Sequence, residues 1–228
     1  NIVTGHLLPD EGKVEWPGRV TVGYLDQQST LEAGKTIREV LRTAFNDMYE
    51  AEKQMLELYD KMADASPEEI DKMMNTVGEL QTELEHSGFY SLDTKIEEVA
   101  NGLGLGSIGL DRDVSELSGG QRSKVLLTKL LLQNSSILLL DEPTNYLDVE
   151  HIEWLTRFLQ NYEHAFILIS HDIAFLNQVV NVIYHLENCE LTRYTGNYDK
   201  FQEMYAIYKA QRESAYERQQ QEIAKLED

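Results

Sequence analysis

Several classes of protein are excluded by what this sequence lacks. Its single cysteine, Cys189, cannot form a disulfide within the chain, and nothing near it has metal-ligand spacing. We expect a packed thiol in a reducing cytosol. The longest apolar runs, such as ILLL before Asp141, fall far short of the roughly 18 residues of a membrane span. There is no initiator methionine and no secretory leader, so we expect a cytoplasmic fragment of a longer protein.

Positive charge is also scarce. The chain has 20 lysines and arginines against 40 aspartates and glutamates, a net charge of −20. This balance argues against a general nucleic-acid surface, because phosphate contacts need clustered basic side chains. Residues 46–98 hold 15 of the acids and 4 lysines, and so carry −11 of that charge. We therefore expect a protein surface or solvent, rather than bare RNA backbone, opposite this segment.

The first half of the chain contains two kinds of periodicity. Short strands are expected at residues 13–16 and within RVTVGYLDQ, residues 19–27. From Thr36 the spacing of apolar residues becomes helical. SPEEIDK, which begins at Ser66, indicates a capped helix start with proline in the first turn. We expect an antiparallel helical hairpin here, followed by a short helix that ends at Gly102 or Gly104.

The second half predicts an α/β core. Residues 118–133, SGGQRSKVLLTKLLLQ, suit a buried helix entered through two glycines. ILLLDEP (137–143) and AFILISHD (165–172) contain short apolar runs typical of parallel strands covered on both faces, with a helix between them. The expected fold class is α/β, with a mostly parallel sheet and a helical subdomain. After Gly196 a helical pattern continues to the end, which predicts a long helix leaving the domain. The alternative is an amphipathic helix that packs on its own domain.

Three groups of residues in this core indicate phosphate chemistry. In LSGGQ, residues 117–121, a hydroxyl residue and two glycines precede a helix, so backbone N–H groups and the helix dipole converge on one spot. The alternative is a glycine turn that only caps the helix. Asp141 and Glu142 end a strand at the carboxyl edge of the sheet, where α/β folds bind ligands.

These acids have distinct expected roles. Asp141 would hold Mg²⁺ through water, and Glu142 would orient or deprotonate an attacking water. A buried strand that simply ends in surface acids is the alternative. His171, after the next strand, could hydrogen-bond a terminal phosphate, or it could only cap the following helix.

Together, and in this order, the motifs resemble those of the ABC ATPase domain over nearly the whole chain. LSGGQ is similar to the signature motif, ILLLDE to the Walker B segment with its catalytic glutamate, NYLD to the D-loop, SHD to the switch histidine and GYLDQ to the Q-loop. The resemblance implies ATP and Mg²⁺ as ligands. It implies that Ser118, Gly119, Gly120 and Gln121 bind the nucleotide held by the partner domain, and that Glu142 and His171 are catalytic. It also implies that Asn145 and Asp148 belong to the D-loop, and that Asp141 and Gln27 bind the metal.

The lysine loop that should bind the phosphates is not found in this sequence. STLEAGKT, residues 29–36, differs from G-x-x-x-x-G-K-[ST] only at its first position. We reject it, because that glycine permits the turn around the phosphates and because the Q-loop match ends just before it. In the ABC family ATP is held between two domains that face head to tail, so LSGGQ serves the nucleotide on the partner's lysine loop. The resemblance places the missing Walker A loop upstream of Asn1, and we expect the fragment alone to be inactive and able to self-associate through unpaired sheet edges.

Local features favour one branch of the family. TNYLD resembles the TN-x-LD of ABC-F proteins, which are twin-ATPase translation factors, and RYTGNYDKF resembles the junction between an ABC-F first domain and its interdomain linker. This implies a longer parent protein that contains a second ABC domain. The parent would bind the ribosome and tRNA, and no membrane partner is expected. The alternative is the ATPase subunit of a membrane transporter, whose chain would end soon after the switch histidine.

The resemblance divides the chain into four parts. Residues 1–35 would be a partial ATP-binding core with the Q-loop, and residues 36–100 a helical subdomain with an arm-like acidic hairpin. Residues 101–196 would form the α/β core from the signature helix to the switch histidine, and residues 197–228 the start of the linker helix.

Overall fold

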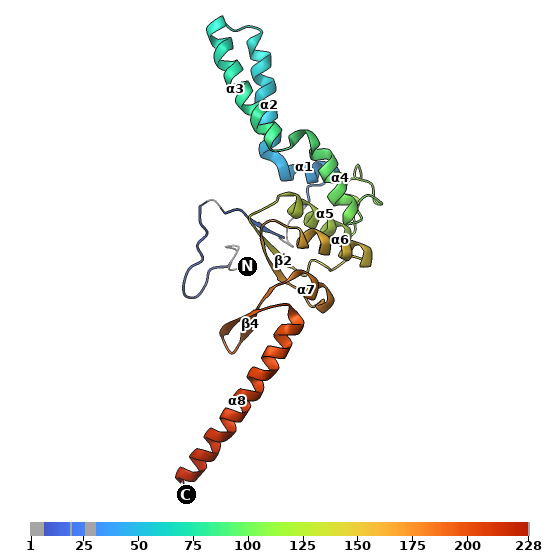
Figure 1. Ribbon diagram of the computed structural model, residues 1–228. Helices are drawn as coiled ribbons and strands as arrows, with labels where there is room; N and C mark the ends of the chain where they lie inside the picture. Colours follow the sequence, from blue (N-terminus) through green and yellow to red (C-terminus); the bar gives the residue numbers. More distant parts are fainter. Residues whose placement is uncertain (1–6, 19, 26–30, 228) are drawn as a thin grey trace. The chain divides into compact units, whose positions relative to one another are not determined.

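The structure, a computed structural model, describes residues 7–18, 20–25 and 31–227 (Figure 1). The chain forms two compact units, one of Asn1–Leu155 with Glu163–Ile169 and one of Thr156–Tyr162 with Ser170–Asp228. The elements of the first unit are β1 (Val22–Tyr24), α1 (Ile37–Arg42), α2 (Asn46–Met62), α3 (Pro67–His86), α4 (Leu92–Gly102), α5 (Gly119–Leu132), β2 (Ile137–Asp141), the start of α6 (Val149–Gln160) and β3 (Ala165–Ile169). Those of the second are the end of α6, α7 (Ile173–Val179), β4 (Val182–Glu187), β5 (Glu190–Thr195) and α8 (Tyr198–Glu227).

A parallel sheet with the order β1–β2–β3 confirms the α/β fold class. Val22 pairs with Ile137 at the start of β1, and β2 pairs with β3 from Ile137–Ala165 to Asp141–Ile169. The middle of β2 is buried, as its apolar sequence predicts. Gly23 lies where a Cβ would be 2.8 Å from a methyl carbon of Leu130, so this glycine lets α5 approach the sheet closely.

The expectation that both faces of β3 are covered is wrong. Ile167 and Ile169 are 55% and 60% exposed. They share one face of the strand, because side chains alternate along a strand. Among the described residues β3 has a strand neighbour on one side only.

The strand predicted at residues 13–16 is also wrong. These residues are exposed and have no strand partner among the described residues, and the charges of Lys13 and Glu15 pair with each other at 2.6 Å. A strand needs a neighbour to take its backbone hydrogen bonds, and alternation over four residues does not supply one. The second expected strand is real but shorter, since β1 covers only Val22–Tyr24.

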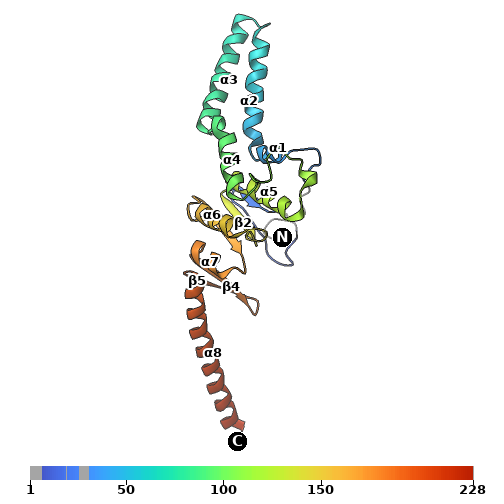
Figure 2. The same cartoon turned by 90° about the vertical axis from the view of Figure 1, so that its right-hand side faces the viewer.

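Helices α2 and α3 form the predicted hairpin and run side by side in both side views (Figure 1, Figure 2). The start of α3 is capped as expected. The backbone N–H and hydroxyl of Ser66 both donate to Oε2 of Glu69, at 2.9 and 2.6 Å. Only Val77 and Leu84 of α3 are buried, and α2 has no buried residue. The acids of the hairpin therefore lie largely at its surface.

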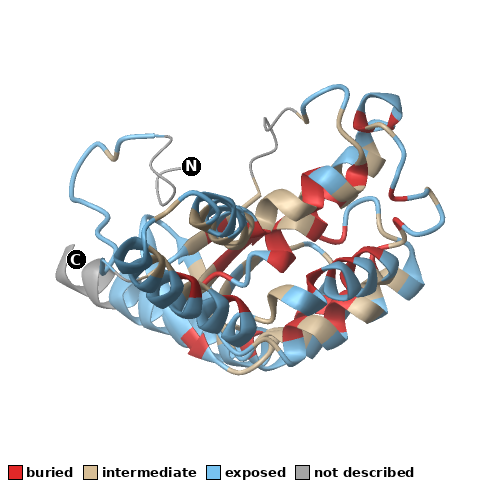
Figure 3. Cartoon of the chain, turned by 90° about the horizontal axis from the view of Figure 1, so that it is seen from above, coloured by how far each residue is buried: buried red, intermediate tan, exposed pale blue. Residues whose placement is uncertain are grey.

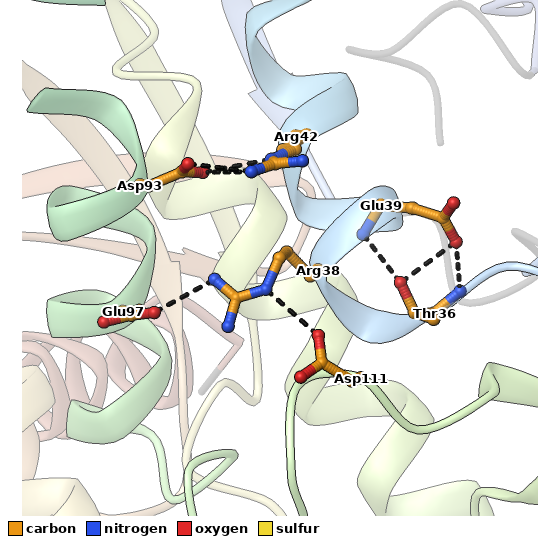
Figure 4. A network of polar contacts seen from close by, with 7 residues as sticks. All are labelled: Thr36, Arg38, Glu39, Arg42, Asp93, Glu97 and Asp111. Atoms are coloured by element: carbon orange, nitrogen blue, oxygen red, sulfur yellow. Dashed lines mark hydrogen bonds and ion pairs between the residues drawn. The ribbon is translucent and has the colours of Figure 1, made fainter. Parts of the chain in front are cut away.

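Two arginines tie α1 to its surroundings at the base of this hairpin (Figure 4). Arg38 donates to Glu97 at 3.0 Å and to Asp111 at 3.2 Å. Arg42 makes a bidentate contact with Asp93, with distances of 2.7 to 3.0 Å. Since Asp93 and Glu97 lie on α4, these pairs fix α1 against α4.

The Arg42–Asp93 pair is expected to make stability depend on pH at the acid end. Hydrogen bonds from Arg42 hold the pKa of Asp93 below its ordinary value. This contribution is therefore present above the unfolded pKa of Asp93, about 3.9, and is lost as pH falls through the lower folded pKa. The carboxylate is 55% exposed, so Asp93→Asn should cost no more than about 1 kcal/mol at pH 7. Urea unfolding from pH 7 to pH 2.5 should show this difference shrink as the pH falls. Asp71→Asn, at an exposed acid of α3, is the control, and a pH-independent loss in Asp93→Asn would contradict the assignment.

The second unit contains an antiparallel hairpin that sequence periodicity did not reveal. Strands β4 and β5 pair from Val182–Thr195 to Glu187–Glu190 around a two-residue turn. Both turn residues, Asn188 and Cys189, have positive φ angles of 50° and 65°. Cys189 is exposed, so the expectation of a packed thiol was wrong: the side chain at the tip of a two-residue turn projects beyond the strands.

The long helix predicted at the end of the chain is α8, whose packing is confined to its first turns. Phe201 is buried near Tyr194 and His185, and the Tyr205 hydroxyl donates to Glu187 at 2.8 Å. Residues 206–221 are all exposed, as the helix ending at the label C shows (Figure 3). An amphipathic helix packed along its own domain does not describe this element. No helix in the described part of the chain has the length and apolar character to cross a membrane.

Candidate functional site

The glycine turn before α5 is held in place by the segment that precedes α1. Val114 donates its backbone N–H to the carbonyl of Lys35 at 3.0 Å, and Ile37 donates to Arg112 at 3.0 Å. Residues 114–116 form a short 3-10 helix, after which Leu117 is buried. The chain therefore reaches Ser118 from a fixed direction.

Ser118 is the N-cap of α5 in a reciprocal capping box. Its N–H donates to Oε1 of Gln121 at 2.9 Å, and its Oγ accepts the N–H of Gln121 at 3.3 Å. Gly119 and Gly120 open the helix, so their N–H groups have no carbonyl one turn earlier to bind. These groups and the helix dipole suit an anion. Capping and anion binding, the two alternatives drawn from the sequence, are therefore compatible.

The two acids at the end of β2 lead into a strained turn. Asp141, the last residue of the strand, is exposed, and Glu142 is half-buried. Glu142 has a φ of 49°, in the left-handed region, which costs a non-glycine residue about 1–3 kcal/mol. Its N–H donates to the carbonyl of Ile169 on β3 at 2.8 Å, and its own carbonyl accepts the N–H of Asn145 at 3.2 Å. These bonds hold the turn at the carboxyl edge of the sheet.

A cavity of about 280 Å³ lies between α5 and the loop that follows β2. It brings Asp141, Glu142 and Asn145 together with two α5 residues that sequence reasoning missed, Ser123 and Lys124. Helical spacing could have found Lys124, because it lies four residues after Gly120 and residues four apart share a helix face. The cavity therefore joins the strand-end acids to a face of α5.

Asp148, assigned to the D-loop, also has a structural task. Its Oδ1 accepts the N–H of His151 at 3.2 Å and its carbonyl accepts that of Ile152 at 2.9 Å, so it caps α6. The same Oδ1 lies 2.7 Å from Nδ1 of His151. The ring of Trp154, one turn further, lies against Gly102 at the end of α4.

His171 belongs to the second unit, where it is exposed between β3 and α7. The cap of α7 comes from its neighbour, since Oδ1 of Asp172 accepts the N–H of Phe175 at 3.0 Å. The alternative in which His171 supplies the cap is therefore wrong. Along the chain, His171 follows Ile169 by two residues, and Ile169 is the strand partner of Asp141.

The remaining assigned residues concern the metal and the lysine loop. Gln27 lies outside the described residues. No group of three His, Cys, Asp or Glu side chains in the described ranges could hold a metal ion. The exposed carboxylate of Asp141 nevertheless fits Mg²⁺, which keeps several waters and binds phosphate oxygens alongside one or two carboxylates.

The described part of STLEAGKT is not arranged as a phosphate loop. Lys35 pairs with Glu32. Thr36 is the N-cap of α1, with its Oγ1 accepting the N–H of Glu39 at 3.2 Å and its N–H donating to Oε2 of Glu39 at 2.7 Å. These bonds occupy the hydroxyl and amide that a phosphate would need.

A parallel sheet that carries acids at its rim, next to a helix entered through a capped glycine turn, is the α/β fold of an ABC-type nucleotide-binding domain. Comparison with known families agrees. The ABC transporter family matches residues 1–145, and a second family also described as ABC transporter matches residues 184–228. The chain belongs to the ABC transporter family, as an ABC ATPase domain, and domains of this family bind ATP with Mg²⁺.

Individual relatives extend over almost the whole chain. It is 60% identical over 228 residues to the ABC transporter ATP-binding protein YfmM of Bacillus subtilis (strain 168), covering 100% of this chain and 44% of that protein. It is 34% identical over 215 residues to the energy-dependent translational throttle protein EttA of Haemophilus influenzae, covering 94% of this chain and 38% of EttA. The archaeal ribosome recycling factor aABCE1, solved with the ribosomal stalk protein aP1, aligns over 90% of this chain and 33% of its own with a TM-score of 0.56 and 24% identity, which shows the fold alone. The chain thus spans less than half the length of each of these three relatives.

Proposed function

We propose that this chain is part of an ABC-F type ATPase that acts as a ribosome-associated translation factor. ATP would be bound and hydrolysed between two domains that face head to tail, and this chain would supply residues to both composite sites. The observation that carries the proposal is the pairing of two features in one unit: the capped glycine turn at Ser118, and the turn at Glu142 held at the sheet rim.

Each residue has a distinct proposed role. The amide groups of Gly119 and Gly120, with the Ser118 hydroxyl and Gln121, would bind the nucleotide held by the partner domain. Bound Mg²⁺ would neutralise phosphate charge, with Asp141 and Gln27 as its protein contacts. Glu142 would orient or deprotonate the attacking water. His171 would donate a hydrogen bond to the terminal phosphate.

The D-loop residues and the long helix complete the proposal. Asn145 and Asp148 would meet the partner domain, with Asp148 held in place by its bonds to α6. We propose the four-part division into residues 1–35, 36–100, 101–196 and 197–228, with α8 as the start of the linker. The chain alone, without a lysine loop in its sequence, would not hydrolyse ATP.

The translational role rests on two supports. One is TNYLD, which resembles the ABC-F D-loop. The other is the 34% identity to a protein named a translational throttle. ATP would close the domain pair in a form that binds the ribosome near tRNA, and hydrolysis would release it. The exposed acids of the α2–α3 hairpin favour a ribosomal protein, rather than RNA backbone, as its neighbour.

Ribosome cosedimentation of the full-length protein tests this proposal. Glu142→Gln, with the equivalent change in the second ATPase domain, should accumulate on ribosomes in the presence of ATP but not ADP. A third change, Gly119→Asp, places a negative charge in the anion-binding turn and should abolish this accumulation. As a matched control, Glu150→Gln alters an exposed acid on α6 and should behave like the wild type. Absence of ATP-dependent ribosome association in the trapped protein would exclude the translation-factor role, and association with membranes would favour the transporter alternative.

A further inference from the structure

The loop that follows β2 contacts the glycine turn through one aromatic ring. A Cβ placed on Gly120 would lie 3.1 Å from Cδ1, 3.3 Å from Cγ and 3.4 Å from Cβ of Tyr146. The Tyr146 side chain therefore lies against the second residue of α5, and the absence of a side chain at Gly120 makes room for it. The contact joins residue 146 to residue 120, and hence the strand-end loop to the glycine turn.

Two properties of Tyr146 are not explained by packing. Its side chain is 68% exposed, so it adds little to the hydrophobic core. Its φ is 68°, a left-handed conformation that glycine or asparagine adopts more readily than a bulky aromatic residue. The backbone would be less strained without tyrosine here, and strain of this kind collects at functional sites.

The turn on which Tyr146 stands also contains Glu142. The N–H of Asn145 donates to the carbonyl of Glu142 at 3.2 Å, and the N–H of Leu147 donates to that of Thr144 at 3.1 Å. Two short hydrogen-bonded turns thus connect the acid to the ring. The ring therefore links the glycine turn, which it contacts at Gly120, to the loop that positions the acid.

We propose that Tyr146 is a positioning residue that holds the Ser118–Gln121 turn in register with the Glu142 turn. The inference rests on the proposed function, in which these two turns serve different nucleotides of the head-to-tail pair. The glycine-turn amide groups would bind one nucleotide, and Glu142 would serve the other. The contact of Tyr146 with Gly120 joins these two groups into a single assembly. The ring acts through Gly120 and touches no reacting atom.

The test replaces the ring without adding backbone strain. Tyr146→Asn removes the aromatic group but retains a residue that tolerates a positive φ, and Tyr146→Phe keeps the ring as the matched control. In the full-length protein, Tyr146→Asn should raise the KM for ATP about threefold to tenfold, because the amide groups that bind the nucleotide are no longer held in place, while kcat stays within about twofold. Tyr146→Phe should match the wild type in both. The melting temperature of Tyr146→Asn should be unchanged or higher.

Hydrogen exchange supplies a readout that does not depend on turnover. The amides of residues 119–122 should exchange faster in Tyr146→Asn than in Tyr146→Phe, both without nucleotide. Unchanged exchange would overturn the inference, whatever the kinetics show, since the ring would then not restrain the turn. A lower melting temperature with unchanged KM would reduce Tyr146 to a packing role and would equally overturn it. Failure of the wild-type protein to hydrolyse ATP would instead count against the proposed function, and the exchange comparison would still decide the role of Tyr146.

Discussion

Glu142→Gln is expected to lower ATP turnover by the full-length protein at least about a hundredfold at that site, the scale of losing a general base. The substitution keeps the size of the side chain but replaces a carboxylate that can accept a proton with an amide that cannot. The turn itself should persist, because its hydrogen bonds to Ile169 and Asn145 use the backbone of residue 142 and not its side chain. We therefore expect an unchanged melting temperature and retained ATP binding.

Phosphate release at saturating ATP measures this effect, with the second ATPase domain inactivated by the equivalent change so that one site is observed. Glu150→Gln on α6 is the control for removing one negative charge nearby. Turnover within about tenfold of the wild type would show that another group activates the water, and would remove Glu142 from the catalytic role. A variant that no longer binds ATP would instead indicate that the carboxylate supports the site structurally.

Features that depend on residues a few positions apart could be predicted from the sequence. Ser66 caps its helix as expected. Ser118 also caps its helix, and the spacing of each serine three positions before Glu69 or Gln121 is what permits a reciprocal capping box. The strand that ends at Asp141 was predictable because a short apolar run that ends in acids suits a buried parallel strand. In each case the hydrogen bonds or the burial pattern lie within the segment itself.

Features that depend on the pairing of one strand with another could not be predicted in this way. The segment at residues 13–16 alternates like a strand but has no partner in the described part of the chain. The hairpin of β4 and β5 turns at Asn188 and Cys189, and cysteine gives no signal for a turn that usually takes glycine. Asparagine at the first turn position, between two alternating segments, was the available clue.

The candidate site shows the same division. Residue types and order identified Ser118, Asp141 and Glu142 as a set, but not the ring that lies against Gly120. Glycine at this position is required by the signature resemblance and also leaves room for Tyr146. Only the fold shows the second reason, because 26 residues separate the two in sequence.

Gly102→Ala is expected to destabilise the first unit by about 1–2 kcal/mol, through the contact of α4 with α6. A Cβ on Gly102 would lie 2.1 Å from Cε2 and 2.3 Å from Cδ2 of Trp154. The end of α4 and the indole ring can each move by only a few tenths of an ångström without loss of packing. The added methyl group must therefore push α4 and α6 apart. Overpacking of this kind costs about 1–3 kcal/mol or more, and alanine recovers up to about 1 kcal/mol through its higher helix propensity.

Gly78→Ala provides the opposite result in the same molecule. Gly78 is within α3, and a Cβ there would meet nothing within 4 Å, so alanine should stabilise the helix by about 0.5–1 kcal/mol. Thermal unfolding should therefore move in opposite directions for the two changes. If Gly102→Ala were as stable as the wild type, α6 would have to tolerate displacement from α4, and the start of α6 at Asp148 would not be fixed by that contact. A displacement at Trp154 should also reach Asp148, two turns earlier along α6, so the same variant should weaken the cap that Asp148 makes to His151 and Ile152.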